Sequence, residues 1–529
     1  MRKPLLINGF MATGKSSVGR ALASRVGHPF VDLDQRIEAR TGLSVSELFA
    51  ARGEAEFRAL ERAELAEVLA NSGTPAPVVA VGGGALTRRE TRLDALERAV
   101  IVTLEAGPEE VARRAAGNDA RPLLRGPDRI ERATELLAQR AAGYAEAHDR
   151  IPTDARAIDA IVSDALATWR LDATVVAAGE RSYTVEIGAG ILASRLAAAV
   201  GKPSRLVLVS DSNVLGLHGQ RVLSLLPGLN PAVVELTPGE ENKHIASVER
   251  IWRAALEASA DRKARVRALG GGVVTDVAGF AAATYMRGIS WVGVPSTLLA
   301  MVDASVGGKT GVDLLSAKNA VGAFWQPSRV LCDVELLATE SVRGFRSGLA
   351  EVVKSGLIGD PELLELLEAA PADLSQWPTE LRVECVRRSI GVKARIVSRD
   401  EREGGLRAVL NLGHTVGHAL EAVGGYARLT HGEAVSLGLV AALRIGVGLG
   451  VTPLALAKRS EALLAHLGLP TDIAAEPLEA SLQLIGHDKK RAGKNVKFVV
   501  AKAPGKVDTI DLELSSLQAL TRELAQPSA

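Results

Sequence analysis

The first third of the chain alternates short apolar runs with longer segments in which apolar positions recur every three or four residues. Leu5–Ile7, Phe30–Val31, Val78–Val81 and Ala99–Val102 are short apolar runs of the kind found in buried strands, and Lys15 to about Val26 has helical spacing. Strands that alternate with helices pair in parallel. The pattern therefore predicts an α/β fold with a parallel sheet.

A second alternation begins near residue 170. Thr174–Val176 and Tyr183–Gly188 form a strand-and-turn pattern, and Leu206–Asp211 starts another run of strands and helices. From about residue 343 the pattern is mostly helical, with weak strand signals near Val496–Val500. We therefore predict three parts joined by short connections: residues 1–170, 173–342 and 343–529.

Length and composition agree with a soluble protein of several domains. A chain of 529 residues exceeds one ordinary core. Its 63 Lys and Arg nearly balance 62 Asp and Glu, so no overall field favours nucleic acid or an anionic membrane. Ala434–Val451 is apolar, but Arg444 and several glycines interrupt it, which predicts a buried helix. With only two cysteines, we expect a cytoplasmic protein.

A phosphate-binding loop stands near the start. Gly9 and Gly14-Lys15-Ser16, with four residues between the two glycines, lie between a predicted strand and a predicted helix. This context favours phosphate binding over a plain glycine turn, because backbone N–H groups at a helix N-terminus bind phosphate oxygens. Lys15 supplies a cation to the phosphates, and the Ser16 hydroxyl can ligate Mg²⁺.

Other polar residues and glycines of this segment can be interpreted from their position near the phosphate-binding loop. Asp32 and Asp34 alternate in an extended segment, so their carboxylates share a side. Alone they would be interpreted as a solvated pair, but beside Mg·ATP one can serve the metal and the other a hydroxylated acceptor. Gly82-Gly83-Gly84 lets a small acceptor approach the backbone.

Taken in order, these motifs resemble shikimate kinase. They are the phosphate loop, Asp32-x-Asp34, Gly53-Glu54-x-Glu56-Phe57-Arg58, Gly82-Gly83-Gly84-Ala85 and Arg121-Pro122-Leu123-Leu124, over about residues 3 to 168. The resemblance implies ATP binding by Gly9, Gly14, Lys15, Ser16 and Ser17, and Mg²⁺ at Ser16 and Asp32. It implies shikimate binding by Asp34, Arg58 and Arg140, beside Gly83 and Gly84. Arg121 would lie on a lid, and the catalytic residues would be Lys15, Asp34 and Arg121.

Ala12 departs from that family, which usually has a glycine at this position of the loop. If the position needs a positive φ, alanine is strained there by about 1 kcal/mol. We expect a weakened or unaffected kinase, with a degenerate, non-catalytic module as the alternative.

The middle of the chain carries a second set of polar motifs. Gly270-Gly271-Gly272 follows an apolar strand, although on its own it is as consistent with a bland turn as with a nucleotide site. Ser296-Thr297, Asp303, Lys309 and Lys318-Asn319 add hydroxyls, a carboxylate and cations. Together they predict a polar cleft that receives phosphates.

Three residues further on suggest a metal site. Glu351 and Lys354 share a helix face, His414 and His418 share another, and His431 follows. Two imidazoles and one carboxylate with an open fourth position form a catalytic zinc set. Ordinary core or surface histidines are the alternative, and the spacing alone does not exclude them.

In this order the motifs resemble 3-dehydroquinate synthase. They include Gly270 to Asp276, Tyr285-Met286-Arg287-Gly288, Pro295 to Ala300, Asp303 to Gly311, Ala350 to Lys354 and Asn411 to His418, over about residues 175 to 520. The resemblance implies NAD⁺ at Asp211, Glu240, Lys243, Gly271, Gly272, Asp276, Ser296 and Thr297. It implies zinc, or cobalt, at Glu351, His414 and His431. The substrate pocket would be lined by Arg287, Asp303, Lys309, Lys318, Asn319, Lys354, Lys393, Arg407, Asn411, His418 and one of Lys489 or Lys490, with Asp303, Lys309, Lys354 and His418 catalytic.

We therefore expect an α/β chain in which a P-loop kinase domain precedes a Rossmann-like nucleotide-binding domain and a mostly helical metal-binding domain. The resemblances imply a bifunctional shikimate-pathway enzyme whose partners are shikimate, ATP and a heptulosonate phosphate. They also imply a homodimer formed through the C-terminal module. The alternatives for that module are a related sugar-phosphate cyclase and a polyol dehydrogenase.

Overall fold

The computed structural model describes residues 3–116, 128–315, 317–489 and 495–525, with side chains in 485–489 left undescribed. The chain divides into two compact units, Met1–Thr184 and Val185–Ala529. The sequence predicts a joint near residue 170, where helix α7 ends, whereas this division falls after Thr184.

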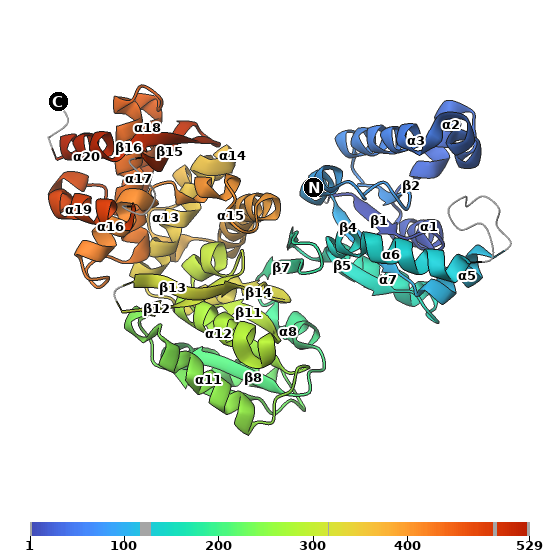
Figure 1. The fold of residues 1–529 in the computed structure, drawn as a ribbon, viewed down its shortest axis with the longest axis horizontal. Helices are drawn as coiled ribbons and strands as arrows, with labels where there is room; N and C mark the ends of the chain where they lie inside the picture. The colour runs from blue at the N-terminus through green and yellow to red at the C-terminus, as the bar shows by residue number, and fades with distance from the viewer. Residues whose placement is uncertain (1–2, 117–127, 316, 490–494, 526–529) are drawn as a thin grey trace. The chain divides into compact units, whose positions relative to one another are not determined.

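The first unit is built on a five-stranded sheet (Figure 1). Its elements are β1 (Leu5–Gly9), α1 (Lys15–Val26), β2 (Phe30–Asp32), α2 (Leu33–Thr41), α3 (Val45–Ala70), β3 (Val78–Ala80), α4 (Arg89–Arg98), β4 (Val100–Glu105), α5 (Pro108–Ala115), α6 (Arg129–Ala145), β5 (Asp149–Pro152), α7 (Ile158–Arg170) and β6 (Ala173–Val176). The strand order is β2-β3-β1-β4-β5, and every pair is parallel.

Side-chain alternation along β1 explains why helices cover both faces of this sheet. Leu5 and Ile7 join a core with α1 and α7, whereas Leu6 joins a core with α3 and α4. A strand buried on both sides has no polar face, which is why these strands are continuous apolar runs in the sequence. The parallel sheet with helices on both faces is as predicted.

The second unit contains a run of parallel strands in the order β14-β11-β10-β8-β9. Its elements are β7 (Tyr183–Gly188), α8 (Leu192–Val200), β8 (Leu206–Asp211), α9 (Ser212–Val214), α10 (Gln220–Ser224), β9 (Ala232–Leu236), α11 (Ile245–Glu257), β10 (Arg265–Gly270), α12 (Gly272–Thr284), β11 (Ser290–Pro295), the hairpin β12 (Lys309–Leu314) and β13 (Ala317–Phe324), and β14 (Arg329–Asp333). Strands β8 and β10 pack against α11 and α12 in one apolar core. The carboxyl ends of β8, β10 and β11 thus lie along one edge, where such sheets bind ligands.

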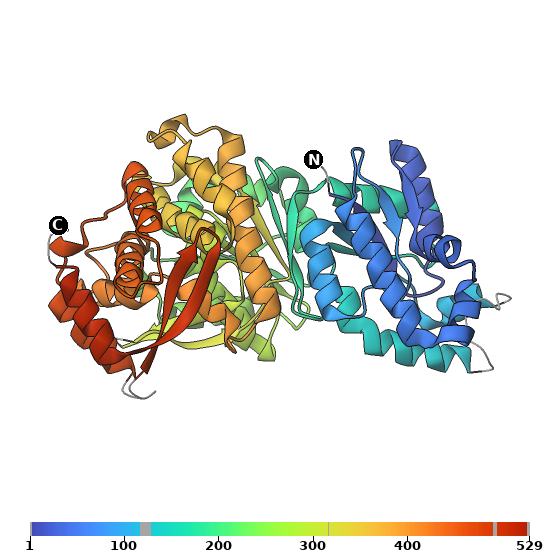
Figure 2. The same ribbon diagram turned by 90° about the horizontal axis from the view of Figure 1, so that it is seen from above.

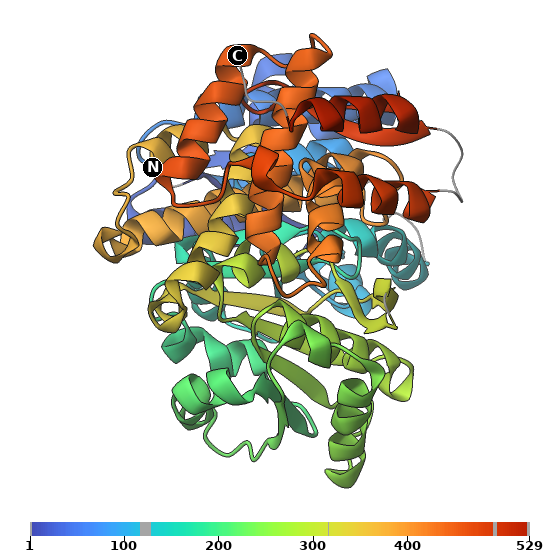
Figure 3. The same cartoon turned by 90° about the vertical axis from the view of Figure 1, so that its left-hand side faces the viewer.

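The rest of the unit is mostly helical. It contains α13 (Val342–Gly359), α14 (Pro361–Glu368), α15 (Thr379–Arg399), α16 (His414–Val423), α17 (His431–Gly448), α18 (Leu454–His466), α19 (Leu478–Lys489), the hairpin β15 (Asn495–Ala503) and β16 (Lys506–Glu513), and α20 (Leu514–Glu523). Helix α17 is largely buried and packs against α13, α16 and the β15–β16 hairpin (Figure 2). Helices α19 and α20 lie side by side (Figure 3). No helix in the described ranges is long and apolar enough to cross a bilayer.

Candidate active sites

The phosphate loop joins β1 to α1 in the first unit. Gly14 has φ 92° and precedes Lys15, the first residue of α1. A Cβ on Gly9 would lie 2.4 Å from the carbonyl oxygen of Leu104, so only glycine fits there. Lys15 Nζ donates to the Phe10 carbonyl oxygen at 2.9 Å, and Ser16 Oγ donates to Asp32 Oδ2 at 2.6 Å. The loop thus has the form that cradles phosphates, with a hydroxyl and a carboxylate together for Mg²⁺.

Ala12 has φ 65°, which lies in the left-handed region where the Cβ of an alanine is strained. Its Cβ costs about 1 kcal/mol in that region. We therefore expect Ala12→Gly to stabilise the first unit by up to about 1 kcal/mol, measured by hydrogen exchange of the β1 and β4 amides in the full chain.

Ala66→Gly is the matched control for that prediction. Ala66 is an exposed residue of the regular part of α3, where glycine should destabilise the unit by about 1 kcal/mol. A destabilising Ala12→Gly would contradict strain in the loop.

A cavity of about 380 Å³ opens beside the loop. Its lining includes Lys15, Ser16, Ser17, Asp32, Asp34, Arg58, Gly83, Gly84 and Arg140, so residues predicted to bind ATP, Mg²⁺ and acceptor come together. Arg140 Nη1 donates to the Gly83 carbonyl oxygen at 3.0 Å, and a Cβ on Gly84 would lie 2.1 Å from Arg58 Cζ. Burial raises the pKa of Asp34, while Lys15 lowers it. Arg121 lies outside the described residues.

Two residues of this cavity region were missed in the sequence. The buried Glu61 pairs with Arg58, and burial raises the pKa of Glu61 to about 7 against the lowering effect of that guanidinium. The Tyr144 hydroxyl donates to the Gly83 carbonyl oxygen at 3.0 Å. Each stands one helical turn after a predicted residue, Arg58 or Arg140, so same-face spacing was the available signal.

A second cavity, of about 360 Å³, lies at the carboxyl edge of the second sheet. Asp211, Gly271, Gly272, Ser296 and Thr297 line it, all predicted to bind NAD⁺. Strand β10 ends at Gly270 and α12 begins at Gly272, so the N–H groups of the first helical turn face this edge. Ser296 Oγ is buried without a hydrogen-bond partner in the described part of the chain. A buried hydroxyl of this kind, next to a helix N-terminus, fits a dinucleotide-binding site.

The other residues predicted around the nucleotide form a polar cluster. Lys243 Nζ contacts Asp276 Oδ2 at 2.6 Å and Asn319 Oδ1 at 2.5 Å. Burial raises the pKa of Asp276 to about 6, although Lys243 lowers it. Lys318 Nζ lies 3.2 Å from Glu240 Oε1. Lys318 and Asn319, predicted to bind substrate, therefore contact residues predicted to bind the cofactor.

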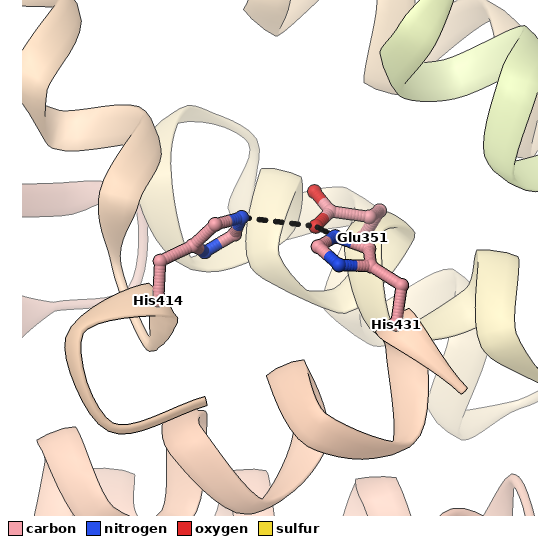
Figure 4. Close-up of side chains that lie close together, drawn as sticks. All are labelled: Glu351, His414 and His431. Carbon is pink, nitrogen blue, oxygen red and sulfur yellow. Dashed lines mark ion pairs between the residues drawn. The ribbon is translucent and has the colours of Figure 1, made fainter. Parts of the chain in front are cut away.

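Glu351, His414 and His431 converge from three helices (Figure 4). Glu351 lies within α13, while His414 and His431 are the first residues of α16 and α17. Glu351 Oε1 is 3.6 Å from His414 Nε2 and 3.4 Å from His431 Nε2. This oxygen is buried and has no hydrogen-bond partner within the described ranges. A buried carboxylate oxygen and two imidazole nitrogens around one point suit zinc.

The charges in this cluster agree with a cation site. Burial lowers the pKa of His414, which keeps its imidazole neutral as a metal ligand must be. Burial opposes protonation of His431, but Glu351 and Glu421 raise its pKa to about 9. The two carboxylates therefore favour positive charge at the position of His431.

Cationic side chains surround the three ligands. Lys354 pairs with Glu351 between two buried groups, and the buried Lys393 pairs with Asp303, whose side chain is 33% exposed. Burial raises the pKa of Asp303, but Lys393 and Lys354 together lower it to about 2. Arg407 is buried and donates to the carbonyl oxygen of Glu401 at 2.6 Å. The side chain of His418 is 58% exposed, with its ring 4.9 Å from that of His414.

Other predicted substrate residues are exposed or pair with residues outside the predicted set. Lys309 Nζ pairs with Glu403 Oε1 at 2.6 Å, and Asn411 is exposed. Arg287 is exposed, with φ 67°, directly after Met286 with φ 48°. The side chain of Lys489 lies outside the description, as does Lys490. Glu421, which no motif singled out, lies beside His431.

These sites define a class of protein. In this class a P-loop kinase unit is followed by a nucleotide- and metal-binding unit with a Rossmann-like sheet. Residues 11–170 match the family model of shikimate kinase, 233–347 that of the 3-dehydroquinate synthase N-terminal domain, and 348–491 that of its C-terminal domain. The chain belongs to the 3-dehydroquinate synthase family and carries a shikimate kinase domain fused ahead of it.

Individual relatives agree with that assignment. The 3-dehydroquinate synthase of Caulobacter vibrioides is 44% identical over 341 residues, covering 62% of this chain and 92% of the relative. That of Gloeobacter violaceus is 47% identical, covering 59% and 87%. A solved 2-epi-5-epi-valiolone synthase of Streptomyces hygroscopicus, with NAD⁺ and Zn²⁺ bound, is 28% identical with a TM-score of 0.59, covering 65% of this chain and 96% of that one. These relatives do not favour a polyol dehydrogenase.

Proposed function

We propose that the second unit converts 3-deoxy-D-arabino-heptulosonate 7-phosphate to 3-dehydroquinate with release of phosphate, and that the first unit phosphorylates shikimate with ATP. The observation that carries the proposal is the convergence of Glu351, His414 and His431 in a unit that also holds a nucleotide cavity. A metal triad together with a dinucleotide cleft suits transient oxidation of a hydroxyl.

In the second unit, zinc held by the triad would polarise substrate oxygens, and NAD⁺ in the cleft would take and return a hydride. The chain's own residues bind and orient the substrate. Lys354 and Lys393 offer ammonium groups for its phosphate and carboxylate, and their partners Glu351 and Asp303 hold them in place. His418, exposed beside the metal ligands, is placed to relay a proton.

In the first unit, Arg58 and Arg140 bind the acceptor's carboxylate, and Asp34 accepts the proton of its hydroxyl. All three side chains line the cavity that also contains Lys15 and the Ser16–Asp32 pair. The shared cavity supports a reaction in which acceptor and phosphate donor meet in one space, and positioning supplies much of phosphoryl-transfer catalysis.

Two further features belong to this proposal. The protein would act in the cytoplasm, and it would form a homodimer through its second unit. Light scattering of the full chain tests the second point, with a mass of twice 55.4 kDa as the expected result.

The function is tested with metal-free protein reconstituted with Zn²⁺. We expect release of phosphate from the heptulosonate phosphate only when both Zn²⁺ and NAD⁺ are present, without net NADH. With shikimate and Mg·ATP, the same sample should release ADP. Accumulation of NADH would contradict a cyclase and favour a dehydrogenase, whereas absence of ADP release would leave the first unit as a binding module.

A further inference from the structure

Helix α16 presents three polar residues on one face. His414, His418 and Glu421 are spaced four and three residues apart, so their side chains point to the same side. His414 is one of the three converging ligands, and α16 packs against α17, which begins at His431. The face of α16 that supplies His414 therefore also brings Glu421 next to His431.

Glu421 is a buried carboxylate beside the second nitrogen of His431. It is 3% exposed, and its Oε2 lies 3.4 Å from His431 Nδ1. Across the ring, His431 Nε2 lies 3.4 Å from Glu351 Oε1. Within the described ranges Glu421 Oε2 has no hydrogen bond of standard geometry, and His431 Nδ1 at 3.4 Å is nearer to it than His418 Nε2 at 4.0 Å.

The start of α17 fixes His431 for this contact. Thr430 caps the helix through a capping box with Glu433, and Glu433 also pairs with Arg343. With the backbone held, rotation of the imidazole is the remaining freedom of the ligand. A carboxylate at Nδ1 limits that rotation and selects the tautomer whose Nε2 lone pair faces the cation.

We propose that Glu421 is a positioning residue for the metal ligand His431, orienting its imidazole and raising its basicity toward the cation. The inference rests on the proposed function for the identity of the metal. Lys318 Nζ, 3.5 Å from Glu421 Oε1 and 3.2 Å from Glu240 Oε1, holds this carboxylate from the other side. Lys318 therefore contacts both Glu421, which lies beside His431, and Glu240, which is predicted to bind the nucleotide.

A second metal at His418, Glu421 and His431 is the competing interpretation, since their ligand atoms also lie within 4.8 Å of one another. It requires both nitrogens of His431 to bind cations at once, which means loss of the ring's remaining proton. It also relies on His418, whose side chain is 58% exposed. A supporting carboxylate needs neither condition.

The test measures the zinc dissociation constant of the metal-free full chain by competition with a chromophoric chelator, without substrate. Glu421→Ala should weaken zinc binding by about 10- to 100-fold, and Glu421→Gln, whose amide oxygen still accepts from Nδ1–H, by less. Glu186→Gln is the matched control, because Glu186 is an equally buried, ion-paired carboxylate on β7. NAD⁺ binding by each variant, measured by fluorescence, shows whether the second unit is folded.

Lys318→Met supplies a coupling measurement. It should weaken zinc binding about three-fold in the native background, and have little further effect in Glu421→Gln, because the lysine acts through that carboxylate. Equal zinc affinity in Glu421→Ala, Glu421→Gln and native protein would overturn the proposal. So would a loss in His418→Ala as large as that in Glu421→Ala, which would indicate a second metal site.

The two levels of inference fail separately. A native chain that binds zinc tightly but releases no phosphate would refute the proposed function and leave the zinc comparison valid. Phosphate release by a native chain whose Glu421→Ala variant keeps full zinc affinity would refute only the role of Glu421.

Discussion

Replacing His414 by alanine should abolish phosphate release by the second unit while leaving ADP release by the first unit unchanged. His414 Nε2 lies 3.6 Å from Glu351 Oε1, at the point where the three ligand atoms converge. Without it only one carboxylate and one imidazole are left, fewer than a catalytic zinc site uses. The metal's stabilisation of developing charge is worth several kcal/mol, so we expect a loss on the order of 10³-fold or more.

The fused kinase provides an internal standard for that experiment. Both rates are measured on one sample, so errors of concentration and purity cancel in their ratio. His466→Ala is the matched control, because His466 lies at the end of α18 and contacts the Ala370 carbonyl oxygen at 2.9 Å, away from the metal ligands. Near-native phosphate release by His414→Ala in the presence of a chelator would contradict the metal site.

Local pattern was sufficient to predict much of the fold. The apolar runs at Leu5–Ile7 and Leu206–Asp211 are strands β1 and β8, and the helical spacing from Lys15 to Val26 is α1. The two strands are buried on both faces, and the helix follows a glycine loop. The hydrophobic pattern and the loop residues therefore predict the same elements. The position of the joint is harder to predict, because no change in composition marks it.

The convergence of Glu351, His414 and His431 could be predicted because histidine is scarce, with nine in the chain, and because their motifs resemble those of one family in order. The role of Glu421 could not be predicted, since a glutamate in the last turn of an amphipathic helix is ordinary until α17 is packed against it. Likewise, nothing local pairs Lys309 with Glu403, which is 94 residues away. Contacts made by tertiary packing leave no spacing signal in one sequence.

Ala12 shows a third kind of limit. The sequence identifies the unusual residue, but whether that residue is strained depends on its φ angle. The value of 65° lies in the left-handed region. Backbone conformation in a loop depends on the strand before it and the helix after it, so it follows from the assembled fold.

Replacing Lys15 by alanine should strongly reduce, but not abolish, ADP release by the first unit and leave phosphate release by the second unit unchanged. Lys15 begins α1 and its ammonium lies in the cavity with Asp34 and the Ser16–Asp32 pair. Loss of one cation directed at the transferring phosphate costs about 10²- to 10³-fold in turnover. Arg25→Ala is the matched control, because Arg25 is a cation on the last turn of the same helix, bonded to Ser163 at 2.9 Å.

The residual activity of Lys15→Ala should also change its pH dependence. Lys15 lowers the pKa of Asp34, against burial, which raises it. Without the ammonium the pKa of Asp34 rises further, so the carboxylate that accepts the shikimate proton is ionised only at higher pH. The acid limb of the rate profile should therefore move to higher pH in Lys15→Ala and stay in place in Arg25→Ala. An unmoved limb would show that Asp34 does not take that proton, even if turnover falls as expected.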